Sequence, residues 1–218
     1  MAKLPKAFYC GADVISIARQ LLGNVLVTRI GGEITSGMIV ETEAYQGVTD
    51  RASHAWAGRR TDRTEIMFGE GGKAYVYLCY GIHHLFNIVT NQKEIPHAIL
   101  IRALEPIQGI GVMLRRSGKE KPEHTLTSGP GSLSRALGID RRLHTGESLT
   151  GKNIWIRKGK RTLKTSEIVA STRIGISYAG PDAYQPWRFH IRGNPWVSRA
   201  KGLDPGEKIK GRPTTRLL

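Results

Sequence analysis

The chain has 218 residues, of which 39% are hydrophobic and 23% charged, so it has enough apolar residues to build a core. Its 33 Lys and Arg against 18 Asp and Glu give a formal charge of +15, which indicates a polyanionic partner, nucleic acid before an anionic membrane. No apolar stretch approaches the roughly 20 residues of a membrane-spanning helix, and the N-terminus does not have the apolar segment of a secretory signal. These patterns exclude a membrane-spanning or secreted protein, and two cysteines are too few for a disulfide framework or a structural zinc site.

The first third of the chain predicts a helix, a hairpin and a long loop. Apolar residues recur at helical spacing between Asp13 and Gly23, which act as start and stop signals. Two β-branched stretches then flank Gly31 and Gly32, which supply the positive φ angles of a tight turn. The expected elements are a helix over 14–22, strands over 25–30 and 35–45, and an irregular loop over 46–72, whose length indicates a function.

The rest of the chain alternates strands with short helices. A hairpin is expected with Tyr80 near its tip, and Pro106 is expected in the first turn of a helix. The expected strands are 73–80, 82–90, 98–104, 153–157, 167–176 and 187–191, and the expected helices are 106–113 and 131–138. The sequence therefore predicts a single-domain α+β protein, mainly antiparallel β-sheet with peripheral helices, over residues 1–200, followed by a basic flexible tail over 201–218.

Two acidic residues and one aromatic residue share a strand face in the stretch Val40–Tyr45. Glu41, Glu43 and Tyr45 alternate with apolar or small residues, so their side chains point to the same side. A solvated strand face is the simple alternative. The other interpretation is a partly desolvated carboxylate against an aromatic wall, which can act as a general base.

Three tyrosines lie within one short segment. Tyr75 and Tyr77 share a face by their spacing of two, whereas Tyr80 is displaced towards the turn. Taken alone, they are typical of core packing or cross-strand pairs. In so basic a chain they also have the chemistry for stacking on nucleobases or for inserting between base steps.

Together these motifs resemble the alkyladenine (3-methyladenine) DNA glycosylase family of the mammalian type, which has bacterial members. The resemblance runs in order from about residue 8 to about residue 200. The matching segments are Val40–Tyr45, His54, Arg59–Thr61, Met67–Phe68, Tyr75–Gly81, Asn87, Leu100–Pro106, Ser128–Pro130, Arg188–Phe189 and Arg192–Ser198.

The resemblance implies a monofunctional DNA glycosylase of base excision repair. Members flip a damaged purine out of duplex DNA and hydrolyse its N-glycosidic bond, leaving an abasic site without strand cleavage. They use no metal, no other cofactor and no covalent intermediate. By motif position, Glu43 is similar to the general base that activates water, Arg102 helps to orient the carboxylate and the water, and Ile174 offers its backbone carbonyl to the same water.

The resemblance also implies a base pocket and a wedge. Tyr45, His54 and Tyr77 would form its walls, and Asn87 would crowd the exocyclic amino group of guanine and so select against a normal base. Tyr80, on a hairpin that inserts into DNA, would occupy the place of the flipped nucleotide.

Simpler roles exist for several of these residues. Arg102 could pair with Glu105, His54 could cap a loop, and Asn87 could end a strand, while Trp196 is expected in the core. The chain also departs from the family pattern at Asp62, Thr64 and Ser132, which puts one loop conformation and one phosphate contact in doubt.

The function expected from the sequence is release of alkylated or deaminated purines from duplex DNA by a monomer. The candidate lesions are 3-methyladenine, 7-methylguanine, hypoxanthine and ethenoadenine. The alternative is a non-catalytic basic module that binds nucleic acid. The expected location is the cytoplasm, with the nucleoid, in a bacterium, or the nucleus in a eukaryote.

Overall fold

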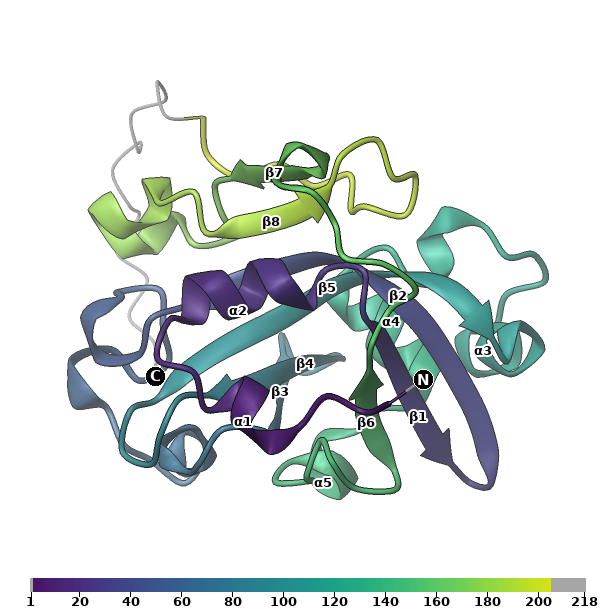
Figure 1. Ribbon diagram of the computed structural model, residues 1–218, viewed down its shortest axis with the longest axis horizontal. Coiled ribbons are helices and arrows are strands. Elements are labelled where there is room, and N and C mark those ends of the chain that lie inside the picture. Colours follow the sequence, from purple (N-terminus) through teal and green to yellow (C-terminus); the bar gives the residue numbers. More distant parts are fainter. Residues whose placement is uncertain (1, 205–218) are drawn as a thin grey trace.

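One curled antiparallel sheet dominates the structure, a computed structural model that describes residues 2–204 (Figure 1). The strand order is β3-β4-β5-β2-β1-β6, and β8 pairs with both β2 and β7. The strands are β1 Val25–Ile30, β2 Glu33–Tyr45, β3 Ala74–Cys79, β4 His83–Thr90, β5 His97–Gln108, β6 Ile154–Arg157, β7 Ile168–Ser171 and β8 Arg188–Ile191. The α-helices are α1 Lys6–Tyr9, α2 Val14–Leu21, α3 Ile110–Ser117, α4 Pro130–Leu137 and α5 Arg141–His144. The predicted α+β class is confirmed.

Helix α2 and the first hairpin follow the sequence signals closely. The Asp13 carboxylate accepts hydrogen bonds from the first backbone N–H groups of α2, as an N-cap residue does. Gly31 and Gly32 both have positive φ angles at the β1–β2 turn. The predicted helix and hairpin are therefore confirmed, with β2 starting two residues earlier than expected.

The long strand β2 has two different faces. One packs against helix α2, and the other carries the acidic residues. Its first part pairs with β1 and its last part with β8, while β5 runs along its other edge. Helix α2 lies across the front of the sheet and α4 behind it (Figure 1). The Thr42 hydroxyl donates to the Ala18 carbonyl of α2 at 3.0 Å. Because side chains alternate along a strand, Glu41 and Glu43 point away from α2.

Two predicted boundaries are wrong. Pro106 lies in β5 and not in the first turn of a helix, because the register between β2 and β5 shifts beside its partner Gly37, and such an irregularity tolerates a residue without an N–H. Helix α3 begins only at Ile110, after Gly109 turns the chain with φ +77°. The strand expected over 167–176 ends at Ser171, where the pairing with β8 stops.

The segment between β2 and β3 has no strand and contains short 3-10 turns, as the sequence predicted. Thr64, at one departure from the family pattern, fixes part of this loop by accepting from Thr61 N–H at 2.8 Å and donating to the Arg59 carbonyl at 3.1 Å. Over residues 2–204, no helix combines the length and the apolar character needed to cross a bilayer. Of the predicted flexible tail, residues 205–218 lie outside the described part of the chain.

Candidate active site

Arg102 joins the two carboxylates of β2. Its Nε donates to Glu41 Oε1 at 2.9 Å, and its Nη1 lies 3.3 Å from Glu43 Oε1. In the pairing of β2 with β5, neither Val40 nor Arg102 has a residue opposite it, which marks β-bulges in the two strands. These bulges turn the Arg102 side chain towards both carboxylates. The alternative of a pair with Glu105 is wrong, since the nearest carboxylates to the Arg102 guanidinium are those of β2.

Glu43 is fully buried, accepts two hydrogen bonds and forms an ion pair with Arg102. Tyr45 Oη donates to Oε2 at 2.8 Å, and the Ile174 N–H donates to Oε1 at 2.8 Å, the atom that Arg102 also approaches. Burial and the neighbouring Glu43 carboxylate hold the pKa of Tyr45 well above its usual value, so its hydroxyl stays a donor. Each partner is a donor, so Glu43 acts here as an acceptor at both oxygens.

Glu41 has a different environment, although it is equally buried. Its Oε1 accepts from Arg102, from Arg188 Nε at 2.7 Å and from the Ser198 hydroxyl at 2.8 Å, and its Oε2 accepts from the Ser198 N–H at 2.8 Å. Burial alone would raise the pKa of Glu41, but the two guanidinium groups and the Ser198 N–H hold it below its usual value. Glu41 is therefore neither a solvated residue nor a free base.

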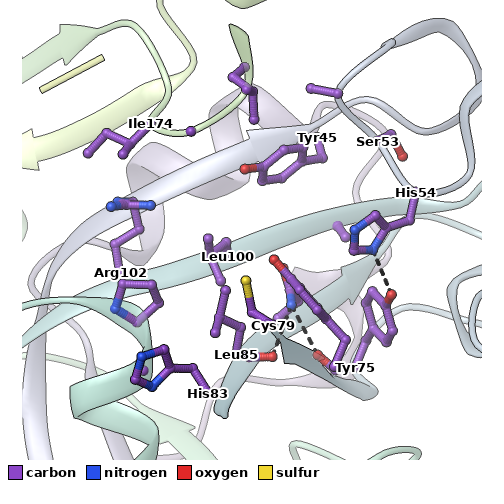
Figure 2. A pocket seen from close by; sticks show the side chains of 18 of the residues that line it. Tyr45, Ser53, His54, Tyr75, Cys79, His83, Leu85, Leu100, Arg102 and Ile174 are labelled. Atoms are coloured by element: carbon purple, nitrogen blue, oxygen red, sulfur yellow. Dashed lines mark hydrogen bonds between the residues drawn. The ribbon is translucent and has the colours of Figure 1, made fainter. Parts of the chain in front are cut away.

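A cavity of about 580 Å³ lies in front of this cluster. Arg102 and Ile174 line it beside Tyr45, so all three partners of Glu43 contact the cavity. Figure 2 shows Arg102 and His83 towards one end of the cavity and His54 towards the other. Glu43 itself lies behind its donors and has no exposed surface.

The far wall is aromatic. The His54 and Tyr77 rings meet edge to face with centroids 4.7 Å apart, and Tyr75 and Tyr77 lie 5.8 Å apart. His54 Nδ1 lies 2.7 Å from Tyr75 Oη. Burial, with help from the positive charges of Arg63 and Arg59, lowers the pKa of His54 to about 4, so the ring is neutral at neutral pH. These contacts give His54 a place in the cavity wall and not merely a loop cap.

Asn87 is fixed at the floor of the cavity in the middle of β4. Its Nδ2 donates to the Tyr75 carbonyl at 3.2 Å and to the Leu85 carbonyl at 3.3 Å. Both amide hydrogens are thereby engaged, and the side chain cannot rotate away without losing these bonds. The alternative that Asn87 ends a strand is wrong.

Tyr80 lies at the exposed tip of the β3–β4 hairpin, beside the cavity. Its side chain is 90% exposed, the largest exposure among the large hydrophobic residues described. Tyr80 and Gly81 have φ angles of +51° and +74°, and the Ile82 N–H donates to the Cys79 carbonyl at 3.1 Å. This is the backbone of a type I′ turn, in which a tyrosine is unusual.

The structure thus brings all eight predicted site residues together around one cavity. Sequence reasoning gave no site role to Arg188 and Ser198, although both lay in matching motifs, and it missed Tyr178 and Gly131, which line the cavity. Ser132, where a phosphate contact was in doubt, lies at the start of α4 on the cavity rim. Trp196 packs against the core, as expected. No cluster of three His, Cys, Asp or Glu residues within 2–204 could hold a metal ion.

Comparisons with known proteins agree with this geometry. The family model described as methylpurine-DNA glycosylase matches residues 7–195. The chain belongs to this family. Curated relatives named "Putative 3-methyladenine DNA glycosylase" include one from Chlamydia abortus, 46% identical over 87% of this chain and 99% of its own length. A second, from Bacillus cytotoxicus, is 46% identical over 90% of this chain and 100% of its own length.

Family membership makes the chain a DNA glycosylase, which is a hydrolase of N-glycosyl bonds. The bacterial relatives cover nearly the whole described chain. The family match therefore includes the sheet, the residues that line the cavity and the two buried carboxylates. The resemblance seen in the motifs is confirmed.

Proposed function

We propose that the chain is a monofunctional glycosylase that releases alkylated purines, such as 3-methyladenine and 7-methylguanine, and also hypoxanthine and ethenoadenine, from duplex DNA. The observation that carries this proposal is the buried Glu43 carboxylate, held by two hydrogen bonds and one ion pair from residues that all line an aromatic cavity. The names of the relatives support 3-methyladenine as one substrate.

In this proposal the flipped base enters the cavity and stacks between Tyr45 on one side and His54 with Tyr77 on the other. Base–aromatic stacking contributes roughly 1 to 3 kcal/mol per base, which offsets the few kcal/mol that flipping costs. The neutral His54 ring adds no positive charge next to a cationic alkylated base. Asn87, locked at the floor, would collide with the exocyclic amino group of an undamaged guanine.

Glu43 acts as the general base. A carboxylate offers about four acceptor positions, and the hydrogen bonds from Tyr45 and Ile174 occupy two of them, so acceptor capacity remains for a water that enters with the substrate. The water oxygen bonds to C1′ of the deoxyribose, its proton passes to Glu43, and the electrons of the broken C1′–N bond go to the departing base. Arg102 orients the carboxylate and the water, and the Ile174 carbonyl accepts from the same water.

Hydrolysis leaves an abasic site and no strand break. A glycosylase that also cleaves the strand forms a Schiff base through an amine, and within residues 2–204 no lysine lines this cavity. The partner is duplex DNA that contains damaged purines, and the enzyme acts on it as a monomer. It is located where the cell keeps its DNA.

The proposal is tested by single-turnover release of free base from a methylated duplex. Glu43→Gln should lower the rate by at least about 100-fold, since a positioned general base contributes 10²- to 10⁴-fold, while binding to the same duplex changes little. A wild-type protein that shifts the duplex in a gel but releases no base would instead be a non-catalytic binding module.

A further inference from the structure

Arg173 is a buried residue that none of the proposed catalytic roles uses. It is fully buried, and its Nη1 and Nη2 donate to the two oxygens of Asp50 at 2.5 and 2.9 Å. The same guanidinium donates to the Ala44 carbonyl at 2.9 Å and to the Asp182 carbonyl at 3.0 Å. One side chain therefore ties the end of β2 and the loop after it to the segment that follows β7.

The Arg173 contacts converge on the two hydrogen-bond donors to Glu43, Tyr45 and Ile174. The guanidinium lies over the Tyr45 ring at 4.8 Å from its centroid, and that ring carries the hydroxyl bonded to Glu43. Ile174, the next residue in the chain, contributes the N–H bonded to the same carboxylate. A displacement of Arg173 would move both donors together.

A purely structural role is the simpler alternative for such a pair. Buried ion pairs are often no more stabilising than well-packed apolar residues of the same size. Stability alone therefore does not explain why Arg173 and Asp50 are charged. The Arg173 guanidinium also lies over the Trp187 ring, 5.0 Å from its centroid. Contacts with the Trp187 and Tyr45 rings hold the plane of the guanidinium in place.

We propose that Arg173 is a positioning residue for base release: braced by Asp50, it sets the plane of Tyr45 and the direction of the Ile174 N–H, and through both it orients the Glu43 carboxylate. The inference rests on the proposed function. Arg173 itself touches neither the base nor the water, because it lines no part of the cavity.

The first test is Arg173→Lys in the full chain. Lysine keeps the positive charge but loses the planar fork that bonds Asp50 and lies over the ring. We expect the maximal single-turnover rate to fall about 10- to 100-fold, as displacements near 1 Å can cause, with the half-saturating enzyme concentration changing less. The loss should be larger for hypoxanthine than for 7-methylguanine, because a neutral base leaves less readily and depends more on the base catalyst.

A matched control and a second variant separate positioning from folding. Thr28→Val also removes buried hydrogen bonds, to Thr35 and to the Leu137 carbonyl, but far along the sheet, and it should leave both rates unchanged. Asp50→Asn removes the partner of Arg173 while keeping the shape, and it carries the test if Arg173→Lys does not fold. Thermal unfolding of each variant sets the assay temperature.

Non-additivity with Tyr45→Phe decides the outcome. If Arg173 acts through Tyr45, the double variant should lose clearly less than the product of the two single factors. Equal losses on both lesions together with full additivity would show that Arg173 only stabilises the fold. Failure of the wild-type protein to release either base would instead reject the proposed function.

Discussion

At the scale of single residues, the site holds two carboxylates on the same strand face that differ in the number of hydrogen bonds they accept. Glu43 accepts two hydrogen bonds, from Tyr45 and Ile174, whereas Glu41 accepts four, from Arg102, from Arg188 and twice from Ser198. Two neighbouring carboxylates with different surroundings are a common way to divide roles in an active site. We assign the chemistry to Glu43 and the support of Arg102 to Glu41.

This division predicts that Glu41→Gln is not a mild change. It leaves the buried Arg102 and Arg188 with one carboxylate fewer, and breaking a buried pair costs about 3–5 kcal/mol. We expect a loss of that size in the free energy of unfolding, measured with urea, together with slower base release. Glu65→Gln, at the exposed pair with Arg60, should change the free energy of unfolding far less, because solvent screens that pair. A Glu41→Gln protein as stable as this control would contradict the assignment.

His54 predicts a pH dependence of stability. Its pKa in the folded protein is about 4, below the ordinary 6.5, so the unfolded chain binds the proton more readily. The free energy of unfolding should therefore fall as the pH drops from 6.5 towards 4, by up to about 3 kcal/mol from this residue at 1.36 kcal/mol per unit. Urea unfolding of His54→Gln across this range should show a smaller slope. A residual slope is expected, because burial also lowers the pKa of His97 and His190.

At the scale of secondary-structure elements, the β3–β4 hairpin combines exposure with backbone strain. A non-glycine residue in the left-handed region costs of order 1 kcal/mol, and Tyr80 gains no compensating packing there because its side chain is 90% exposed. Strain of this kind concentrates at functional sites. It supports the role that the family resemblance implies for Tyr80, entry into the duplex when the base leaves it.

The strain makes Tyr80→Asn a better test than an arbitrary substitution. Asparagine suits the first central position of a type I′ turn, so the variant should be as stable as the wild type or slightly more stable. Binding to lesion duplex should weaken and release should slow, by less when the lesion lies in a mismatch, since a poorly paired base costs less to flip. Fluorescence of 2-aminopurine in the duplex would report flipping, and undiminished flipping in the variant would remove Tyr80 from this role.

Elements were predictable from the sequence where a local signal set them. Asp13 at the start of α2 and the two glycines of the first hairpin are signals of this kind. Pro106 misled because its place in β5 depends on a register shift against Gly37, which is a long-range contact. The Arg173–Asp50 pair joins residues 123 positions apart, so spacing along the chain could not reveal it.

At the scale of the whole molecule, charge and chemistry are separated. Around the cavity, Glu41 and Glu43 offset the charges of Arg102 and Arg188, so little of the +15 formal charge resides there. Residues 141–164 hold eight Lys and Arg against one Glu, and residues 205–218 hold four against one. We therefore propose that the excess charge attracts DNA of any sequence, while the sheet provides the pocket.

Removal of residues 205–218 tests this separation. The cut leaves Leu203 in place, whose carbonyl accepts from the Thr172 hydroxyl at 2.6 Å, so the segment beside Arg173 keeps its support. Each phosphate contact contributes a slope of about −0.9 to log affinity against log salt, and a loss of one to three contacts should flatten the slope by about one to three units. Non-specific binding should weaken, while single-turnover release at saturating enzyme stays nearly unchanged.

A salt titration of duplex binding beside an excision time course measures both, and an unchanged slope would show that the segment makes no phosphate contact. Normal binding with lost excision would place part of the active site within residues 205–218.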